Sequence, residues 1–373
     1  MSQAKSAKRK AQSGKRPGWS RLKRDLHRQK DGGPEHVTRA GRQEFPTEVS
    51  NPSLCWDTRR LGIGRRRFLK SSLLGAAAVA LRAQLSLAAE TTARNTPQAR
   101  NSTPPGIIDT NVNLFSWPFR SLKYGRSKAL VTKLKKHRII EAWAGSFEAL
   151  FSKDLAGVNA RLAAECREQA PGFLIPFGSV NLAWPDWPED VRRCHEVHQM
   201  PGIRIYPGYQ PFDLDHPGME DLVKMTFDRG LILQVVFGME DPRVHHPMLK
   251  VGPVTFGPLL KVLERTPNAK VELLHFPGSS NQGEDLAQFT SKPNTILDIS
   301  RLEGNGAVGR MIGTIQGLPS ARAPIDRIVF GSHAPYFPVE TALLKLIESP
   351  LDPQQLQAIM QGNARRVMLQ TRQ

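Results

Sequence analysis

The residues best suited to chemistry begin with three polar side chains on one apolar stretch, Ile107–Asn113. Asp109, Asn111 and Asn113 alternate along this stretch, so in a β-strand they project from the same face. Polar side chains on such a face are costly to bury unless they are hydrogen-bonded or used. Two interpretations are therefore open. The three residues form either a satisfied polar strand end or the wall of a pocket, where Asp109 would take part in catalysis and the asparagines would bind substrate.

Two histidines, His275 and His333, stand at or just after the ends of later apolar stretches. Histidine is the usual general acid or base near neutral pH, so both are candidates for proton transfer. The alternative for each is a core histidine whose ring is satisfied by a single carbonyl group.

Further polar side chains are expected at other strand ends. Arg204 and Tyr206 end one apolar run, and Glu141 ends another. A buried arginine needs an anionic partner. Arg204 therefore either pairs with Asp109 or Glu141, or clamps the carboxylate of an acidic substrate with its planar donor fork. Glu141 and Tyr206 complete the predicted substrate-binding set.

These residues must be positioned by the pattern of short apolar runs and longer amphipathic stretches that begins at Gly106. Strands that alternate with helices indicate βα units and a parallel sheet. Eight such units match the size of a TIM (β/α)8 barrel, whose active site lies at the carboxyl ends of the strands. A doubly wound open sheet is the alternative, although the turn after the first run lacks the glycines typical of that fold. The predicted strands are Ile107–Asn113, Arg138–Ala142, Phe173–Val180, Gly202–Tyr206, Leu231–Phe237, Lys270–His275, Thr295–Ile299 and Arg327–Gly331. The predicted helices include Ser127–Lys136, Ala156–Glu168, Asp190–Gln199, Met219–Asp228 and Thr255–Arg265, with closing helices in Pro353–Leu369.

Four motifs, taken in order, resemble the amidohydrolase superfamily, in the subgroup often labelled amidohydrolase 2. The resemblance spans residues 106–370. It implies a TIM barrel that hydrolyses C–N or C–O bonds, or decarboxylates, small acidic or cyclic substrates. The motifs are Asp109-Thr110-Asn111-Val112-Asn113 for the first-strand Asp-x-His-x-His, Val271-Glu272-Leu273-Leu274-His275 for the sixth-strand histidine, Phe330-Gly331-Ser332-His333-Ala334-Pro335 for the last-strand Phe-Gly-Ser-Asp-x-Pro, and Gly362-Asn363-Ala364-Arg365 for the closing helix.

The metal ligands that this resemblance implies are only partly present. Asn111 and Asn113 replace the two first-strand histidines, Val236 replaces the fifth-strand histidine, and His333 replaces the catalytic aspartate. His275 is retained. Amide oxygens are poor zinc ligands, and catalytic zinc needs about three protein ligands. We therefore expect no binuclear centre and at most one divalent metal such as zinc, with His275 and His333 as its candidate ligands; otherwise there is no cofactor.

The segment before the barrel has a different composition. Residues 1–60 are basic and poor in aliphatic side chains, which predicts disorder. In residues 61–89, the cluster Arg65–Lys70 precedes the short apolar run Ser71–Leu81, a pattern that resembles a twin-arginine export signal. The run is too short for a stable membrane span. Residues 90–105 would be a linker and residues 106–373 the barrel.

The charge distribution bears on the partners. Residues 1–70 hold 19 Lys+Arg against 6 Asp+Glu, which is +13 of the formal net charge of +18. The barrel is thus nearly balanced, which argues against a nucleic-acid partner. The cysteines, Cys55, Cys166 and Cys194, form no close pair and indicate neither a zinc knuckle nor a disulfide framework. The sequence does not indicate an oligomeric state.

Together these features predict an exported protein, periplasmic or extracellular, that uses the twin-arginine machinery. Its predicted activity is an amidohydrolase-type hydrolysis or decarboxylation of a small acidic or cyclic substrate. The alternative is a non-catalytic binding protein that has kept the pocket and lost the metal centre.

Overall fold

Eight parallel β-strands form the centre of the structure, a computed structural model that describes residues 106–276, 283–313 and 323–369. The strands are hydrogen-bonded as two sheets, β1 to β3 and β4 to β8. Isolated bridges join the sheets at Gly178–Ile203 and at Val112–Ala334, so the strands close into a TIM (β/α)8 barrel, as predicted. The strands are β1 Ile107–Leu114, β2 Ile139–Ser146, β3 Leu174–Pro176, β4 Gly202–Ile205, β5 Ile232–Val236, β6 Lys270–Leu274, β7 Thr295–Asp298 and β8 Ile328–Val329. The predicted basic segment, export signal and linker lie outside the described residues.

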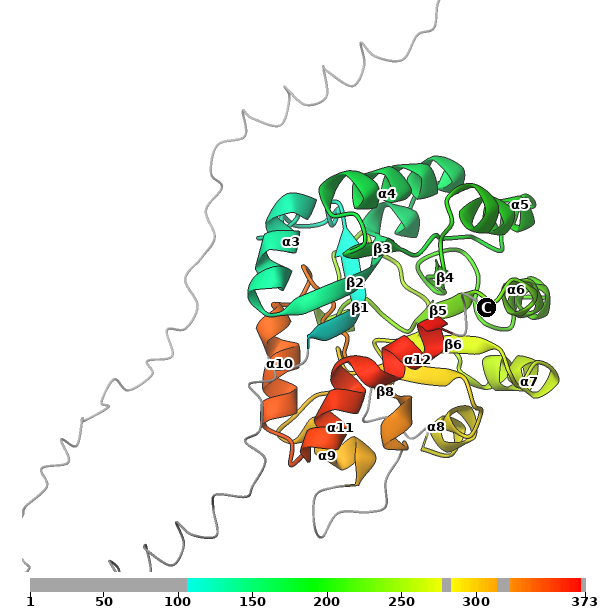
Figure 1. Cartoon of the computed structure of the whole chain (residues 1–373). Helices are drawn as coiled ribbons and strands as arrows, with labels where there is room; N and C mark the ends of the chain where they lie inside the picture. Colours follow the sequence, from blue (N-terminus) through cyan, green and yellow to red (C-terminus); the bar gives the residue numbers. More distant parts are fainter. Residues whose placement is uncertain (1–105, 277–282, 314–322, 370–373) are drawn as a thin grey trace, which may run out of the picture. The chain divides into compact units, whose positions relative to one another are not determined.

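Helices connect the strands and lie around the outside of the barrel (Figure 1). In α3 (Ser127–Lys136), Leu130 and Leu134 are buried while the last turn carries lysines, the one-sided pattern of a helix packed on a sheet. Asp154 caps α4 (Leu155–Gln169) by accepting a hydrogen bond from the backbone nitrogen of Gly157 at 2.8 Å.

The other helices are α5 Trp187–Arg192, α6 Gly218–Asp228, α7 Gly257–Arg265, α8 Gly283–Thr290, α9 Ala307–Ile312, α10 Val339–Ile347, α11 Pro353–Gln357 and α12 Asn363–Leu369. Short 3₁₀ or π segments are η2 Phe147–Leu150, η3 Arg193–Val197, η4 Pro242–Val244, η5 Ile325–Arg327 and η6 Ala358–Gly362.

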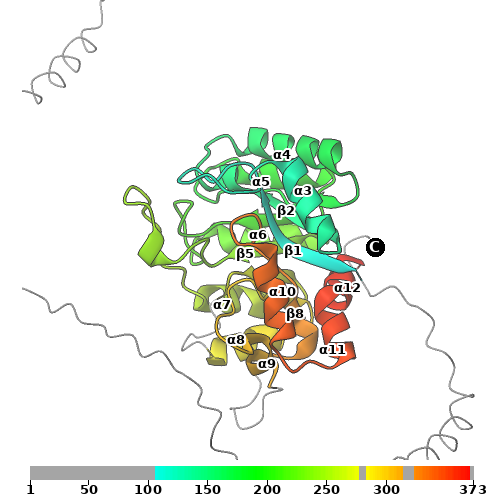
Figure 2. The same cartoon turned by 90° about the vertical axis from the view of Figure 1, so that its left-hand side faces the viewer.

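The amino ends of the strands are closed by the last helix. In α12, Val367 and Met368 pack against interior side chains of the strands, among them Ile108 of β1 and Val329 of β8. Figure 2 shows α12 beside the start of β1. The predicted closing helices after the eighth strand thus cover the amino ends of the strands.

The carboxyl ends of the strands are covered by a second group of buried side chains, which we call the mouth cluster. Aromatic residues from the β1–α3 and β8–α10 connections meet strand-end residues there. The mouth cluster comprises Trp117, Phe147, Ala149, Leu150, Leu155, Val158, Tyr206, Tyr209, Val236, Met239, Leu249, Leu274 and Tyr336. It forms an apolar cover over the end of the barrel where active sites of this fold lie.

Strand β2 extends four residues beyond the predicted end at Ala142, to Ser146. Glu141 therefore lies near the amino end of β2, where it pairs with Ile108 and accepts a hydrogen bond from Trp143 Nε1 at 2.8 Å. The prediction that Glu141 stands at the strand end was wrong. Alanine and glycine in the second half of β2 have low strand propensity, and this hid its length.

The described cysteines, Cys166 and Cys194, are both free and buried. In the part of the chain that the structure describes, the helices are too short or too polar to cross a bilayer.

Candidate functional site

Two histidines leave their strands in a backbone conformation that few non-glycine residues adopt. His275 follows β6 and His333 follows β8, each with φ of 60°. Backbone strain of this kind persists only where the surroundings enforce it, and it is concentrated at functional sites. The two rings face each other with their centroids 3.9 Å apart. The predicted convergence of these histidines at the carboxyl ends of β6 and β8 is therefore present.

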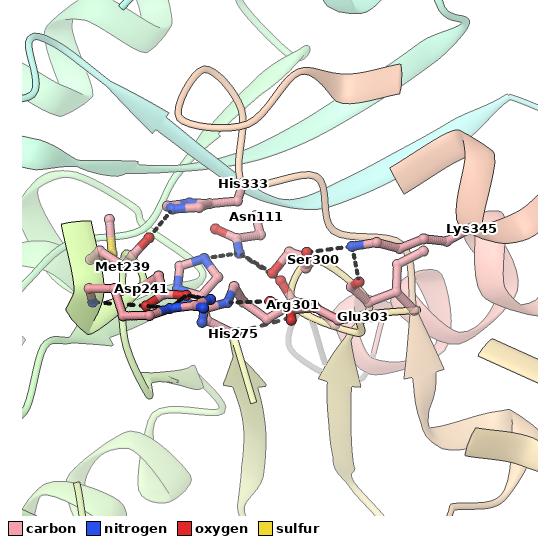
Figure 3. Close-up of polar contacts among 12 residues, drawn as sticks. Asn111, Met239, Asp241, His275, Ser300, Arg301, Glu303, His333 and Lys345 are labelled. Atoms are coloured by element: carbon pink, nitrogen blue, oxygen red, sulfur yellow. Dashed lines mark hydrogen bonds and ion pairs between the residues drawn. The ribbon is translucent and has the colours of Figure 1, made fainter. Parts of the chain in front are cut away.

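Asn111 lies beside the histidine pair (Figure 3). Its amide nitrogen Nδ2 is 2.6 Å from His275 Nε2 and 2.6 Å from Asp298 Oδ2, at the end of β7. The other oxygen of Asp298 accepts a hydrogen bond from the backbone nitrogen of His275 at 3.0 Å. Because Nδ2 carries two hydrogens, it can serve both acceptors. The lone pair of His275 Nε2 is therefore engaged by Asn111.

Hydrogen bonds fix the protonation of His333 as well. Its Nε2 is 2.8 Å from the carbonyl oxygen of Met239, which can only accept, so Nε2 carries the proton. Its Nδ1 is 3.3 Å from Asn113 Nδ2 and accepts that hydrogen bond. The amide of Asn113 is oriented by Arg204, which donates to Asn113 Oδ1 at 3.0 Å. His333 is thus a neutral ring with both nitrogens in use.

Burial sets the charge of these groups. It lowers the pKa of His333 to about 3 and, together with the neighbouring His333, lowers the pKa of His275. It has the opposite effect on acids, raising the pKa of Asp109 to about 7 and raising that of Asp298. Burial disfavours the charged form in each case. The site therefore combines uncharged imidazoles with carboxyl groups that hold protons more readily than usual, which suits proton transfer.

Arg204 lies inside the barrel, and its guanidinium is saturated by protein acceptors. Nε donates to Gln234 Oε1 at 2.7 Å, and Nη1 donates to Asn113 Oδ1 and to the carbonyl of Val112, each at 3.0 Å. Nη2 donates to the carbonyls of Thr110 and Trp143. All five N–H groups are thus occupied. Neither the predicted substrate clamp nor the alternative ion pair with Asp109 or Glu141 fits this arrangement.

Two other predicted site residues support the site from its edges. Asp109 Oδ1 accepts hydrogen bonds from the backbone nitrogens of Asn111 at 3.2 Å and Ser332 at 2.9 Å, so it ties β1 to the segment after β8. Tyr206 belongs to the mouth cluster and donates to the carbonyl of Ser146 at 3.3 Å. Burial raises the pKa of Tyr206.

The sequence interpretation missed Asp298, Arg301 and Lys345. Asp298 is the last residue of β7, which was predicted at Thr295–Ile299. Its position as a polar residue near the end of a predicted strand was the signal that could have identified it. Arg301 follows on the same connection, with its side chain only 15% exposed, and its charge further lowers the pKa of both buried histidines. Lys345 comes from α10 and has no sequence motif. It donates to the carbonyl oxygens of Ile299 and Ser300 (Figure 3).

A cavity of about 460 Å³ lies beside this site, between the β7–α9 connection and α10. Arg301 and Lys345 line it together with the apolar side chains of Leu302, Phe337 and Leu344. His275 and His333 do not line it, because they are only 2% and 0% exposed beneath the mouth cluster. Glu303 and Glu348 also line the cavity, so an apolar wall stands beside two basic and two acidic residues.

A divalent metal does not fit the donor set that surrounds Asn111. A cation would need lone pairs that converge on it. The lone pair of His275 and one oxygen of Asp298 instead converge on an N–H donor, and the lone pair of His333 is used by Asn113. Within the described residues, no group of three or more His, Cys, Asp or Glu side chains is arranged to hold a metal.

The fold and the site together define an α/β-barrel protein with a polar, histidine-containing site at the carboxyl ends of its strands. Residues 130–368, more than half of the chain, match the family described as Amidohydrolase. The chain belongs to this family. The match begins after β1, the strand in which asparagines occupy the expected histidine positions.

Solved structures show the same fold at low sequence identity. An uncharacterised TIM-barrel protein from Bordetella bronchiseptica is 16% identical, with a TM-score of 0.53 over 72% of this chain and 100% of that one. A 2,6-dihydroxybenzoate decarboxylase from Rhizobium is 16% identical, with a TM-score of 0.53 over 70% and 99%. A dihydroxybenzoic acid decarboxylase from Polaromonas sp. JS666, with bound manganese and the inhibitor 2-nitroresorcinol, is 15% identical, with a TM-score of 0.55 over 71% and 97%. No curated protein matches the chain.

Proposed function

We propose that this protein is an exported enzyme that transfers protons to and from a small acidic or cyclic substrate, either hydrolysing a C–N or C–O bond or removing a carboxylate as CO₂. The observation that carries this proposal is the buried His275–His333 pair, held on strained backbone at the carboxyl ends of β6 and β8. A purely structural pair of core histidines would not need both residues in the left-handed region.

The roles follow from the protonation states. His275 and His333 are neutral, and their lowered pKa values make them hydrogen-bonding groups for the substrate and weak bases, while Asp298 and Asp109, with raised pKa values, would hold and supply the proton. In a decarboxylation the bond to the carboxylate breaks, its electron pair stays on the ring carbon, and a proton from one of these acids replaces CO₂. Hydroxybenzoates are suitable first probes, because several proteins of this fold act on them.

The substrate would approach through the cavity beside Arg301. The carboxylate of Glu303, its ion-pair partner at 3.9 Å, is 77% exposed and therefore well screened by water. An incoming carboxylate could replace it next to the less exposed guanidinium. The apolar wall formed by Leu302, Phe337 and Leu344 would contact a ring.

A second candidate, a non-catalytic binding protein, is favoured by one observation. His275 and His333 are covered by the mouth cluster, with the ring of Tyr336 stacked on His333 at 4.8 Å. A ligand in the cavity would not touch either histidine in this arrangement. An enzyme of this design has to displace part of the mouth cluster during its reaction cycle.

The two candidates are separated by turnover. Purified protein is incubated with a panel of hydroxybenzoates, cyclic amides and lactones, and product is followed by chromatography. We expect turnover that falls about 100-fold or more in His275→Gln and in His333→Asn, because the reacting group loses an imidazole placed to hydrogen-bond to it. The control is His195→Gln, on the outer segment η3. Compounds that raise the thermal midpoint without being converted would favour the binding protein. Equal turnover in all three variants would contradict the site assignment.

A further inference from the structure

We infer that the amide of Asn111 takes the place of a metal ion, so that this site is organised around a hydrogen-bond donor instead of a cation. Two of the three groups that face Asn111 Nδ2 are of types that bind metals: an imidazole nitrogen and a carboxylate oxygen. Each lies 2.6 Å from the amide nitrogen, and the third group, the hydroxyl of Ser300, lies at 3.5 Å. The same two groups would turn towards a cation if one were present at that point.

The backbone of Asn111 is held in place on both sides. The backbone nitrogen of Asn111 donates to Asp109 Oδ1 at 3.2 Å, and its carbonyl accepts from the backbone nitrogen of His333 at 2.8 Å. Asn111 is fully buried. Turning Nδ2 away to admit an ion would break its contacts with His275 and Asp298. A metal would have to compete with a donor that is already in place.

The carboxylate of Asp298 is also held in place by its surroundings. A Cβ atom at Gly331 would lie 2.6 Å from Asp298 Oδ2, so only glycine lets this chain segment approach the carboxylate so closely. The second oxygen of Asp298 is held by the backbone of His275 at 3.0 Å. The imidazole and carboxylate are thus fixed in ligand-like positions by protein groups alone. Their geometry does not require a bound ion.

Asn113 provides an internal comparison. It is also a buried asparagine, and its Nδ2 also donates to a histidine, His333. Its oxygen, however, accepts from the guanidinium of Arg204 at 3.0 Å. A cation next to Asn113 would be repelled by this fixed positive charge. The two asparagines should therefore respond differently when each is changed to aspartate.

The experiment compares Asn111→Asp with Asn113→Asp and the wild type. Asn111→Asp removes the donor and adds a carboxylate beside His275 and Asp298, which makes a three-ligand set with an open position. Full-length protein is incubated with excess zinc sulfate, passed over a desalting column and analysed by mass spectrometry for metal. We expect about one zinc per chain in Asn111→Asp, and only background zinc in wild type and in Asn113→Asp. Added zinc should also raise the thermal midpoint of Asn111→Asp alone.

Two results would overturn the inference. The first is a wild type that retains as much zinc as Asn111→Asp. The second is an Asn111→Asp protein that retains no more than Asn113→Asp. If Asn111→Asp does not fold, Asn111→His replaces it, since this change removes the donor and adds an imidazole beside His275 and Asp298. Zinc is then expected to raise the midpoint of Asn111→His but not that of Asn113→His, and the absence of this difference would also overturn the inference. Turnover is not needed for any of these readouts, so the result does not depend on the proposed activity.

Discussion

Buried ionisable side chains in the barrel hold protonation states that differ from those in water. Arg204 is linked through Gln234 to Glu272, because Gln234 Nε2 donates to Glu272 Oε2 at 2.7 Å. Burial nevertheless raises the pKa of Glu272 to about 8. Desolvation of the carboxylate therefore outweighs the attraction of the guanidinium two groups away. Among the described residues, the saturated cation Arg204 thus lies near buried acids, Glu272, Asp109 and Asp298, whose pKa values are all raised by burial.

This state of Glu272 has a consequence for stability. Its pKa in the folded protein, about 8, is above the ordinary value of 4.5, so the folded state holds a proton that the unfolded state loses first. The contribution of this group is fully present below about pH 4 and is lost as the pH rises to 8. The glutamine in Glu272→Gln has the shape of the protonated glutamate but does not titrate. We expect the free energy of unfolding of the variant, relative to wild type, to rise between pH 4 and 8 by a few kcal/mol. Urea denaturation at each pH measures it, and a constant difference would contradict the assignment.

At the scale of strands and helices, the sequence predicted the barrel because its periodicity is regular. Strand β6 begins at Lys270 as predicted, and α3 has the predicted bounds. The third strand was predicted at Phe173–Val180, but β3 ends at Pro176. Beyond Pro176 the chain pairs with β4 only through the isolated bridge at Gly178, so the regular strand stops early. The helical stretch expected at Asp190–Gln199 is divided into α5 and the π segment η3. Local pattern reveals elements well, but their ends depend on neighbouring strands.

The candidate site could be predicted only in part for a related reason. His275, His333, Asn111 and Asn113 come together because barrel closure brings the carboxyl ends of β1, β6 and β8 together, and the order of the strands fixes this. The saturation of Arg204 could not be predicted, since its partners are mostly backbone carbonyls and carry no sequence motif. Lys345 belongs to an outer helix, and only packing brings it to the site.

Close packing of β2 against Arg204 gives a test at the level of the strand. A Cβ atom at Gly145 would lie 2.5 Å from Nη1 and 2.8 Å from Cζ of Arg204, whose side chain cannot move without losing its acceptors. We expect Gly145→Ala to lower the free energy of unfolding by about 1–3 kcal/mol. Gly257→Ala is the matched control, because the first residue of α7 has open space around it. Chemical denaturation of both variants measures the difference, and equal stabilities would show that Arg204 is not locked in place.

At the scale of the whole molecule, the N-terminal segment and the barrel differ in charge. The charge of +13 in residues 1–70 precedes a barrel without a comparable excess, and no described feature of the barrel uses it. We propose that it accompanies an export signal that is removed, leaving a mature protein that begins near Ala89 or Glu90.

Export is tested by replacing the paired arginines. Arg65→Lys with Arg66→Lys should keep the charge but prevent export, because the twin-arginine machinery recognises the pair itself. Arg59→Lys with Arg60→Lys is the matched control outside the motif and should leave export intact. Cell fractionation and N-terminal sequencing give the readout. A full-length wild-type product that stays in the cytoplasm would contradict the proposal.

The seam that closes the barrel is made from the same residues as the candidate site. Thr110 and Phe330 are joined by a hydrogen bond across 220 residues, and Asn111 and Asn113 bond to His333 and Ala334 in the same way. Bringing together chain ends this far apart costs about 5 kcal/mol of loop-closure entropy before any contact is gained. Contacts of such high sequence separation form late in folding. His333 lies beyond β8, so the histidine pair can form only once the chain through this residue is available, and assembly of the candidate site is coupled to closure of the barrel.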